Sequence, residues 1–256
     1  MGCSGLVTPE VLRLRYNATA ARPAGHATQA VAQFLEQYYS PNDLTGFIEG
    51  CDVATTQPQP STIGPNNVSD PGIEATLDIE YIMSVAPNIP TTFISTAGRD
   101  ADQEPFLAFL TTLAAMRTPP NVVSISYGDV ESSLDERYVI RVDAEFQKLA
   151  ARGVTILAAS GDDGVGGACS ASSCKFEPDF PASSPWITTV GGSKFAEDWG
   201  PKCPNGACEV SSSISGGGCN GFVIIWDRFS RIFQPCAIPP PALRGVLYVG
   251  AMRMEC

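Results

Sequence analysis

Apolar positions along the chain follow two different periods, and segments of the two kinds alternate. Spacings of three and four residues and helix-forming composition predict helices at residues 8–16, 27–39, 72–83, 104–116 and 136–151. Short runs of apolar and β-branched residues predict extended segments at residues 91–95, 122–126, 154–159 and 186–190. Strands that alternate with helices are typical of a parallel sheet with helices on both faces. The pattern therefore predicts an α/β fold.

A long polar stretch and a change of composition interrupt this pattern. Residues 51–72 are rich in Pro, Thr, Asn and Gly, which predicts a long surface loop. After Gly218 the charge changes sign, because residues 219–256 hold 4 of the 16 basic residues and only 2 of the 27 acidic ones. We therefore expect one folded region at residues 1–218 and a divergent, irregular tail at residues 219–256.

Charge and hydropathy argue against two classes of partner. The formal net charge of −11 repels the phosphates of nucleic acids and anionic lipid headgroups. No stretch approaches the roughly 20 apolar residues that cross a bilayer, and no secretory leader is recognisable at Met1–Leu6. Neither nucleic acid nor a membrane is expected as a partner.

Cysteines and glycosylation sequons favour an exported protein. Four of the nine cysteines form close pairs in Gly/Ser-rich segments, Cys169 with Cys174 and Cys203 with Cys208. Such spacing favours small disulfide loops; zinc is the alternative, although neither pair has the gap of a zinc knuckle and the only histidine, His26, is distant. Sequons at Asn17 and Asn67 agree with export.

Two carboxylates share one face of the predicted helix at residues 72–83. Glu74 and Asp78 are four residues apart, which places their Cβ atoms within about 6 Å of each other. A solvated helix face is the simpler interpretation of any such pair. The neighbouring apolar residues Ile73, Leu77 and Tyr81 indicate that this helix also packs, so the pair is a candidate site.

A second acidic candidate follows the strand predicted at residues 154–159. Asp162 and Asp163 lie in a Gly-rich loop directly after it, and the carboxyl ends of parallel strands are where active sites form. A Gly-rich turn that these aspartates stabilise is the alternative. Phosphate binding is disfavoured because the loop carries two carboxylates and no lysine of the P-loop kind.

Two Ser- and Gly-containing segments complete the candidates. At Ser124–Gly128 a strand ends with residues that suit hydrogen bonding to an extended substrate, although a plain strand-to-loop transition explains them equally well. Ser215–Gly218 alone indicates only a flexible linker. Because His26 is the sole histidine, a Ser-His-Asp hydrolase is disfavoured, and a catalytic base would be a carboxylate.

Taken in order, nine segments resemble the sedolisin family of serine-carboxyl peptidases, most closely its tripeptidyl-peptidase branch. The resemblance runs from about residue 6 to Gly218, and Gln33–Tyr39 resembles the family's first helix. The segments are Leu6–Pro9, Leu14–Asn17, Gln33–Tyr39, Gly72–Asp78, Gln103–Phe106, Val123–Gly128, Ala159–Asp162, Phe180–Pro185 and Thr188–Gly192.

This resemblance implies a subtilisin-like fold and assigns roles to particular residues. Glu74 matches the general base, Asp78 the acid that orients it and Asp162 the acid of the oxyanion hole. The same resemblance places Ser126, Tyr127 and Gly128 along the substrate cleft. It implies peptide or protein substrates and an extracellular or acidic vacuolar or lysosomal compartment.

The chain also departs from the family pattern. The family nucleophile lies in a Gly-Thr-Ser motif downstream of the Ser-Gly-Gly-Gly segment, and no such motif follows Gly218. We therefore expect a partial catalytic domain, incomplete at its carboxyl end and unable to complete acyl transfer alone. Ser160 and Ser215 are the alternative nucleophiles, but neither matches the family position. A calcium ion is expected in complete members, whereas no metal ligand or cofactor is assignable in this chain.

Two other functions remain open from the sequence. One is a non-catalytic peptide-binding or truncated relative of the peptidase. The other is a glycosidase that uses Glu74 with Asp162 as its carboxylate pair.

Overall fold

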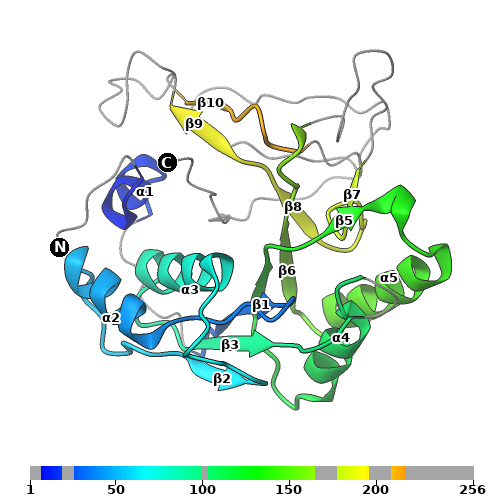
Figure 1. The fold of residues 1–256 in the computed structure, drawn as a ribbon, viewed down its shortest axis with the longest axis horizontal. Helices are drawn as coiled ribbons and strands as arrows, with labels where there is room; N and C mark the ends of the chain where they lie inside the picture. The colour runs from blue at the N-terminus through cyan, green and yellow to red at the C-terminus, as the bar shows by residue number, and fades with distance from the viewer. Residues whose placement is uncertain (1–6, 19–25, 100–102, 165–177, 196–208, 217–256) are drawn as a thin grey trace. The chain divides into compact units, whose positions relative to one another are not determined.

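The computed structural model describes residues 7–18, 26–99, 103–164, 178–195 and 209–216 (Figure 1). The chain divides into two compact units. The first consists of residues 1–126 with 152–154, and the second of residues 127–151 with 155–256. The tail expected at residues 219–256 lies outside the described residues, so the proposed boundary at Gly218 stays a prediction. The four cysteines expected to form small disulfide loops, Cys169, Cys174, Cys203 and Cys208, lie outside them too.

A parallel sheet forms the centre of the first unit. Its strands lie in the order β2, β3, β1, β4, and each pairs with its neighbour in parallel (Figure 1). Their bounds are β1 Gln29–Gln33, β2 Ser61–Ile63, β3 Thr91–Ser95 and β4 Val122–Ile125. Every residue of β1 is buried, as expected of a central strand covered on both faces.

Helices cover both faces of this sheet. Val31 of β1 and Phe93 of β3 are register partners and pack in one apolar cluster with α2 and α3. Phe34, next after β1, lies on the opposite face because side chains alternate, and its ring meets those of Phe106 and Phe109 in α4 at 5.1 and 5.5 Å between centroids. The helices are α1 Pro9–Arg15, α2 Pro41–Gly50, α3 Ile73–Val85 and α4 Phe106–Ala115.

The helix predicted at residues 27–39 is wrong, because this segment holds strand β1. Its i, i+4 spacing of apolar residues matches a helix by coincidence, since a short run that is buried all round carries no diagnostic period. Leu35 and Glu36 have φ angles of 55° and 57°, which end any regular structure there. The likeness of Gln33–Tyr39 to a family helix is corrected too, since the next helix begins only at Pro41.

The other predicted elements of the first unit are confirmed, with small shifts at their ends. The segment at residues 51–72 is mostly loop, as predicted, but it also contains the exposed edge strand β2.

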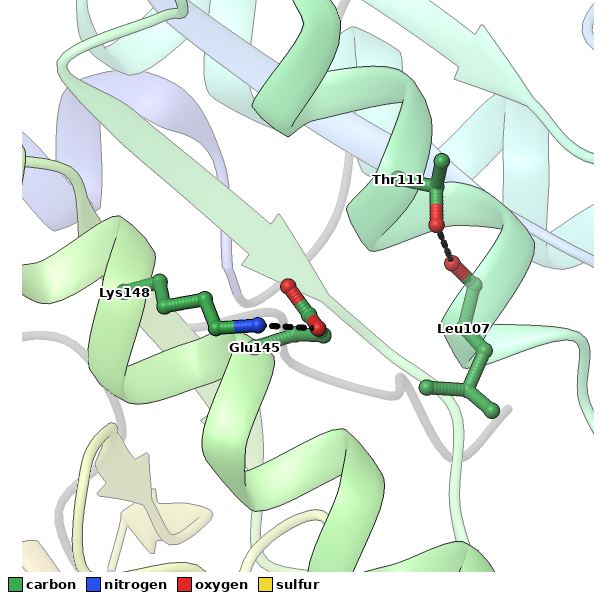
Figure 2. A network of polar contacts seen from close by, with 4 residues as sticks. All are labelled: Leu107, Thr111, Glu145 and Lys148. Carbon is green, nitrogen blue, oxygen red and sulfur yellow. Dashed lines mark hydrogen bonds and ion pairs between the residues drawn. The ribbon is translucent and has the colours of Figure 1, made fainter.

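Within α4, Thr111 donates its hydroxyl hydrogen to the Leu107 carbonyl at 2.7 Å (Figure 2).

The second unit pairs strands in both directions around one long helix. Strands β6 and β8 pair in parallel, whereas β5 with β7 and β9 with β10 are antiparallel. Phe146 of α5 packs against Phe180 with 6.4 Å between ring centroids. The bounds are β5 Asp129–Val130, a 3-10 helix Glu131–Ser133, α5 Glu136–Ala151, β6 Thr155–Ala159, β7 Asp179–Phe180, β8 Thr188–Val190, β9 Ser193–Phe195 and β10 Glu209–Ser211.

The exposed side of α5 carries charged residues and one exposed large apolar side chain, Ile140. Lys148 pairs with Glu145, three residues earlier, at 2.6 Å (Figure 2). The lysine side chain is 64% exposed, so water screens this pair and its contribution to stability is small. With parallel strands and packed helices in both units, the α/β fold class is confirmed. None of the helices in the described ranges is long and apolar enough to cross a membrane.

Candidate functional site

Helix α3 begins at a glycine that lies close to the side chain of Gln37. Gly72 is its N-cap, and the Gly72 N–H donates to the Tyr38 carbonyl at 2.8 Å. A Cβ at this position would overlap Oε1 of Gln37. Glu74 then lies in the first turn, where the positive end of the helix dipole stabilises a carboxylate.

Asp78 is buried one turn further along α3 and is held on both of its oxygens. Its Oδ1 accepts a hydrogen bond from Oγ of Ser126, and its Oδ2 accepts one from Nε2 of Gln33, each at 2.7 Å. Only 5% of its surface is exposed. These short bonds to a carboxylate are of the charge-assisted kind.

Strand order explains why these partners meet. Gln33 is the last residue of β1 and Ser126 directly follows β4, and β1 and β4 are paired in parallel. The carboxyl ends of two neighbouring strands therefore lie side by side under α3. This is the edge of a parallel sheet where α/β proteins place their sites.

Burial and a neighbouring charge change the acidity of Asp78. Desolvation is the main cause and repulsion by Glu74 the second, and together they raise the pKa of Asp78 to about 7 from an ordinary 3.8. The hydrogen bonds from Ser126 and Gln33 act in the opposite direction because they stabilise the charged form. The half-buried Glu74 is thus close enough to Asp78 for its charge to favour the neutral form of Asp78.

Asp162 lies in the second unit, in the loop that follows β6. Its side chain is exposed, and Gly161 before it has a φ of 93°, which favours glycine. A Cβ on Gly161 would overlap Oδ2 of Asp179, so this loop is packed closely against β7.

Asp179 is a functional candidate that the sequence analysis missed. Burial is the main cause that raises its pKa, and the charges of Asp163, Asp129 and Asp162 add to it in that order. Asp129 is far from Asp179 in sequence, and the β5–β7 pairing brings the two together. No group of three or more His, Cys, Asp or Glu in the described part of the chain is arranged to hold a metal ion.

The segment Ser126–Gly128 spans the boundary between the two units. Ser126 closes the first unit and contributes its hydroxyl to Asp78, a contact that the sequence did not reveal. Tyr127 and Gly128 open the second unit. A Cβ on Gly128 would lie 2.6 Å from the Phe180 carbonyl oxygen, so packing alone explains a glycine there.

The two alternative nucleophiles, Ser160 and Ser215, are tied into the local packing. Their Oγ atoms lie 3.4 Å apart, and Ser215 Oγ accepts a hydrogen bond from the Gly192 N–H at 2.9 Å. A Cβ on Gly216 would overlap the Ser160 carbonyl oxygen, and the Gly216 N–H donates to the Gly161 carbonyl at 2.8 Å. These contacts with hydroxyl and backbone groups supply no base that would activate either serine.

The chain is similar in sequence to proteins named tripeptidyl-peptidase 1. It is 47% identical to the protein of Rattus norvegicus and 44% identical to that of Homo sapiens, in each case over 218 residues and 83% of this chain. The matches cover 38% of each of those proteins, so the chain spans well under half the length of these relatives. A comparison with family models gives no match.

Solved structures share the fold at low sequence identity. A Pseudomonas sedolisin, described as a serine-carboxyl proteinase in complex with two molecules of pseudo-iodotyrostatin, matches with a TM-score of 0.56 and 20% identity. That match covers 76% of this chain and 55% of the sedolisin. The prenylagaramide maturation protease PagA matches with a TM-score of 0.50 and 16% identity over 81% of this chain and 63% of PagA.

Proposed function

Because this chain is a sedolisin-type relative of tripeptidyl-peptidase 1 over 83% of its length, we propose that it is part of a serine-carboxyl peptidase that hydrolyses peptide bonds at acidic pH. The observation that carries this proposal is the buried Asp78, held by Ser126 and Gln33 and coupled to Glu74.

Glu74 is the proposed general base for a serine nucleophile. Below about pH 7 the proton of the coupled pair resides on Asp78, because two adjacent carboxylates ionise together only at high cost. Asp78 then acts as a hydrogen-bond donor, and the single negative charge is left to Glu74. A carboxylate accepts the serine proton in acid, where a histidine would already be charged.

Asp162 is proposed to stabilise the oxyanion. A protonated carboxyl donates a hydrogen bond to the negative oxygen that develops on the attacked carbonyl. Its place directly after β6 agrees with this role. Ser126, Tyr127 and Gly128 are proposed to bind the substrate backbone.

The nucleophile is the missing part of this proposal. The 256 residues contain no Gly-Thr-Ser motif, and Ser160 and Ser215 have no basic group among their described contacts. We therefore infer that this chain alone does not form an acyl-enzyme.

Peptides or proteins are the proposed partners, and an extracellular or acidic vacuolar or lysosomal compartment is the proposed location. The acidic net charge and the raised pKa of Asp78 both suit a low pH. Calcium is proposed only for a complete member of the family.

The first test is to sequence the transcript across the codon for Gly218. A reading that continues to a Gly-Thr-Ser segment predicts a product that releases tripeptides or internal fragments from peptides at acidic pH. In that product Glu74→Gln should lower kcat by about 10²–10⁴, whereas Glu80→Gln on the same helix should leave it unchanged. Equal activity of Glu74→Gln and the parent would refute the role of Glu74.

A non-catalytic peptide-binding protein is the second candidate. The described hydrogen bonds of Asp78 lie within the first unit, and neither involves the family nucleophile. This candidate predicts that the 256-residue chain binds unlabelled peptides reversibly, by calorimetry, without cleaving them. A folded chain that binds none would exclude it.

A further inference from the structure

The loop between β2 and α3 is fixed at both ends and exposed between them. Asn66 accepts from the Tyr39 N–H at 3.0 Å and donates to the Tyr39 carbonyl at 3.2 Å. At the other end, the Gly72 N–H donates to the Tyr38 carbonyl. Residues 67–71 lie between these two anchors and are all exposed. The loop therefore presents a short, ordered tip to solvent.

The tip is a turn in which Asn67 and Ser69 contact each other. Asn67 Oδ1 accepts from the Ser69 hydroxyl at 2.7 Å and from the Ser69 N–H at 3.3 Å. The Asn67 carbonyl accepts from the Asp70 N–H at 3.0 Å. Asparagine commonly closes a turn in this way. Both described side-chain hydrogen bonds of Asn67 are made through Oδ1 within the turn, and the exposed side chain leaves Nδ2 accessible.

From this geometry we propose that Asn67 is an N-glycosylation site. The sequence Asn67-Val68-Ser69 has the required pattern, with Val rather than Pro in the middle. The Ser69 hydroxyl that hydrogen-bonds to Oδ1 draws electron density of the amide towards Oδ1, which makes a proton on Nδ2 easier to remove. Val68 is 58% exposed, so a bulky glycan beside it displaces no packed side chain.

The reaction transfers an oligosaccharide from a lipid-linked diphosphate donor. A bond forms between Nδ2 of Asn67 and the anomeric carbon of the first sugar, while the bond from that carbon to the phosphate oxygen breaks. The lipid diphosphate leaves with the bonding electron pair, and Nδ2 loses one proton to a base of the transferase. No oxidant or reductant is needed.

The second sequon supplies a comparison within the same chain. Asn17 is exposed and has a φ of 51°, and Thr19 of this sequon lies outside the described residues. The contact between the asparagine and the hydroxyl is therefore described only at Asn67. Glycosylation at Asn17 and glycosylation at Asn67 can be measured separately by peptide mapping.

The test is to express the full chain behind a secretion leader in a eukaryotic cell. Because the leader supplies export, a failure of this proposal is distinct from an error in the proposed compartment. Purified protein from medium and cell extract is treated with an amide-cleaving N-glycosidase in heavy-oxygen water and mapped by mass spectrometry. We expect a labelled aspartate at position 67.

Three variants sharpen the result. Asn67→Gln and Ser69→Ala should abolish the label at position 67, while Ser69→Thr, which keeps the hydroxyl, should retain it. Position 17 is the internal control in each variant. Recovery of residue 67 wholly as unmodified asparagine in the parent chain, whether or not Asn17 is modified, would overturn the proposal. Persistence of the label in Ser69→Ala would overturn the role of the hydroxyl.

Discussion

The hydroxyl of Ser126 donates a 2.7 Å hydrogen bond to Oδ1 of Asp78 and so joins the end of β4 to the middle of α3. Gln33 makes the matching contact from the end of β1. Both bonds favour the charged form of a carboxyl that burial and Glu74 drive towards the neutral form. The protonation state of Asp78 is thus set by a balance that single substitutions can change.

Replacing Ser126 tests one side of that balance. Ser126→Ala should raise the pKa of Asp78 further, because a hydrogen bond to the charged form is lost. At about pH 8 the variant should lose about 1.5–3 kcal/mol of unfolding free energy, and less at about pH 5, where the carboxyl is protonated. NMR titration of the Asp78 carboxyl carbon measures the shift. Ser126→Thr keeps the hydroxyl and serves as the control; an unchanged pKa in Ser126→Ala would contradict the prediction.

Replacing Asp78 itself should remove a pH dependence of stability. An acid whose folded-state pKa is raised binds its proton more tightly in the folded state than in the unfolded state. The contribution of Asp78 to stability is therefore greatest below its unfolded-state pKa of 3.8 and falls as the pH rises to about 7. A shift of this size corresponds to on the order of 4 kcal/mol.

Asp78→Asn should accordingly flatten the curve of unfolding free energy against pH between about pH 4 and pH 8. Urea unfolding followed by circular dichroism measures this curve. Asp70→Asn, at an exposed position of the same unit, is the matched control and should leave the curve unchanged. A curve for Asp78→Asn that is as steep as that of the parent would rule out the assignment.

Glu80 and Asp43 form a second acidic pair in the first unit. Burial, followed by the charge of Asp43, raises the pKa of Glu80 to about 7. Because the pKa of Glu80 is also higher in the folded state, ionised Glu80 destabilises the fold. This effect begins as the pH rises above the unfolded-state pKa of 4.5 and is complete above about pH 7. Glu80→Gln should raise the unfolding midpoint in urea at about pH 8 and leave it unchanged at about pH 4. The exposed Glu49→Gln on α2 is the control, and a midpoint that rises equally at both pH values would count against this explanation.

Gly216 should tolerate no side chain. A Cβ there would overlap the backbone oxygen of Ser160, which cannot move without disturbing the end of β6. Gly216→Ala should therefore cost about 1–3 kcal/mol of unfolding free energy, as overpacking does. At Gly192 in the same unit a Cβ would make only ordinary contacts, 3.7 Å from Ser212 and 3.9 Å from Ser215. Thermal unfolding of the two alanine variants gives the comparison, and equal stability would refute the steric account.

The sequence predicted the parts of the fold whose patterns are local and strong. Helices α3 and α5 were predicted within about two residues of their ends because their apolar residues recur with a clear helical period. Strand β1 was missed because all five of its residues are buried, which leaves no alternation to detect. Gln33 was missed with it, since a buried polar residue is conspicuous only once its segment is known to be a strand.

The candidate site was predictable only where its residues are neighbours in sequence. Glu74 and Asp78 follow from helical spacing, whereas the bonds of Asp78 to Gln33 and Ser126 depend on β1 and β4 being adjacent. Strand order is not encoded in any local pattern. Asp179 was missed for a similar reason, because the pairing of β5 with β7 and the packing of the loop after β6 place it among other carboxylates.

All side chains described around Asp78 come from the first 126 residues of the chain. Only Arg152–Val154 joins that unit from later, where Arg152 donates to the carbonyls of Ala114 and Met116 after α4. Because a ribosome makes the amino-terminal part first, Asp78 and its described partners are translated before the loop that bears Asp162. A nascent chain that has emerged as far as Val154 already contains Asp78 and all of its described partners.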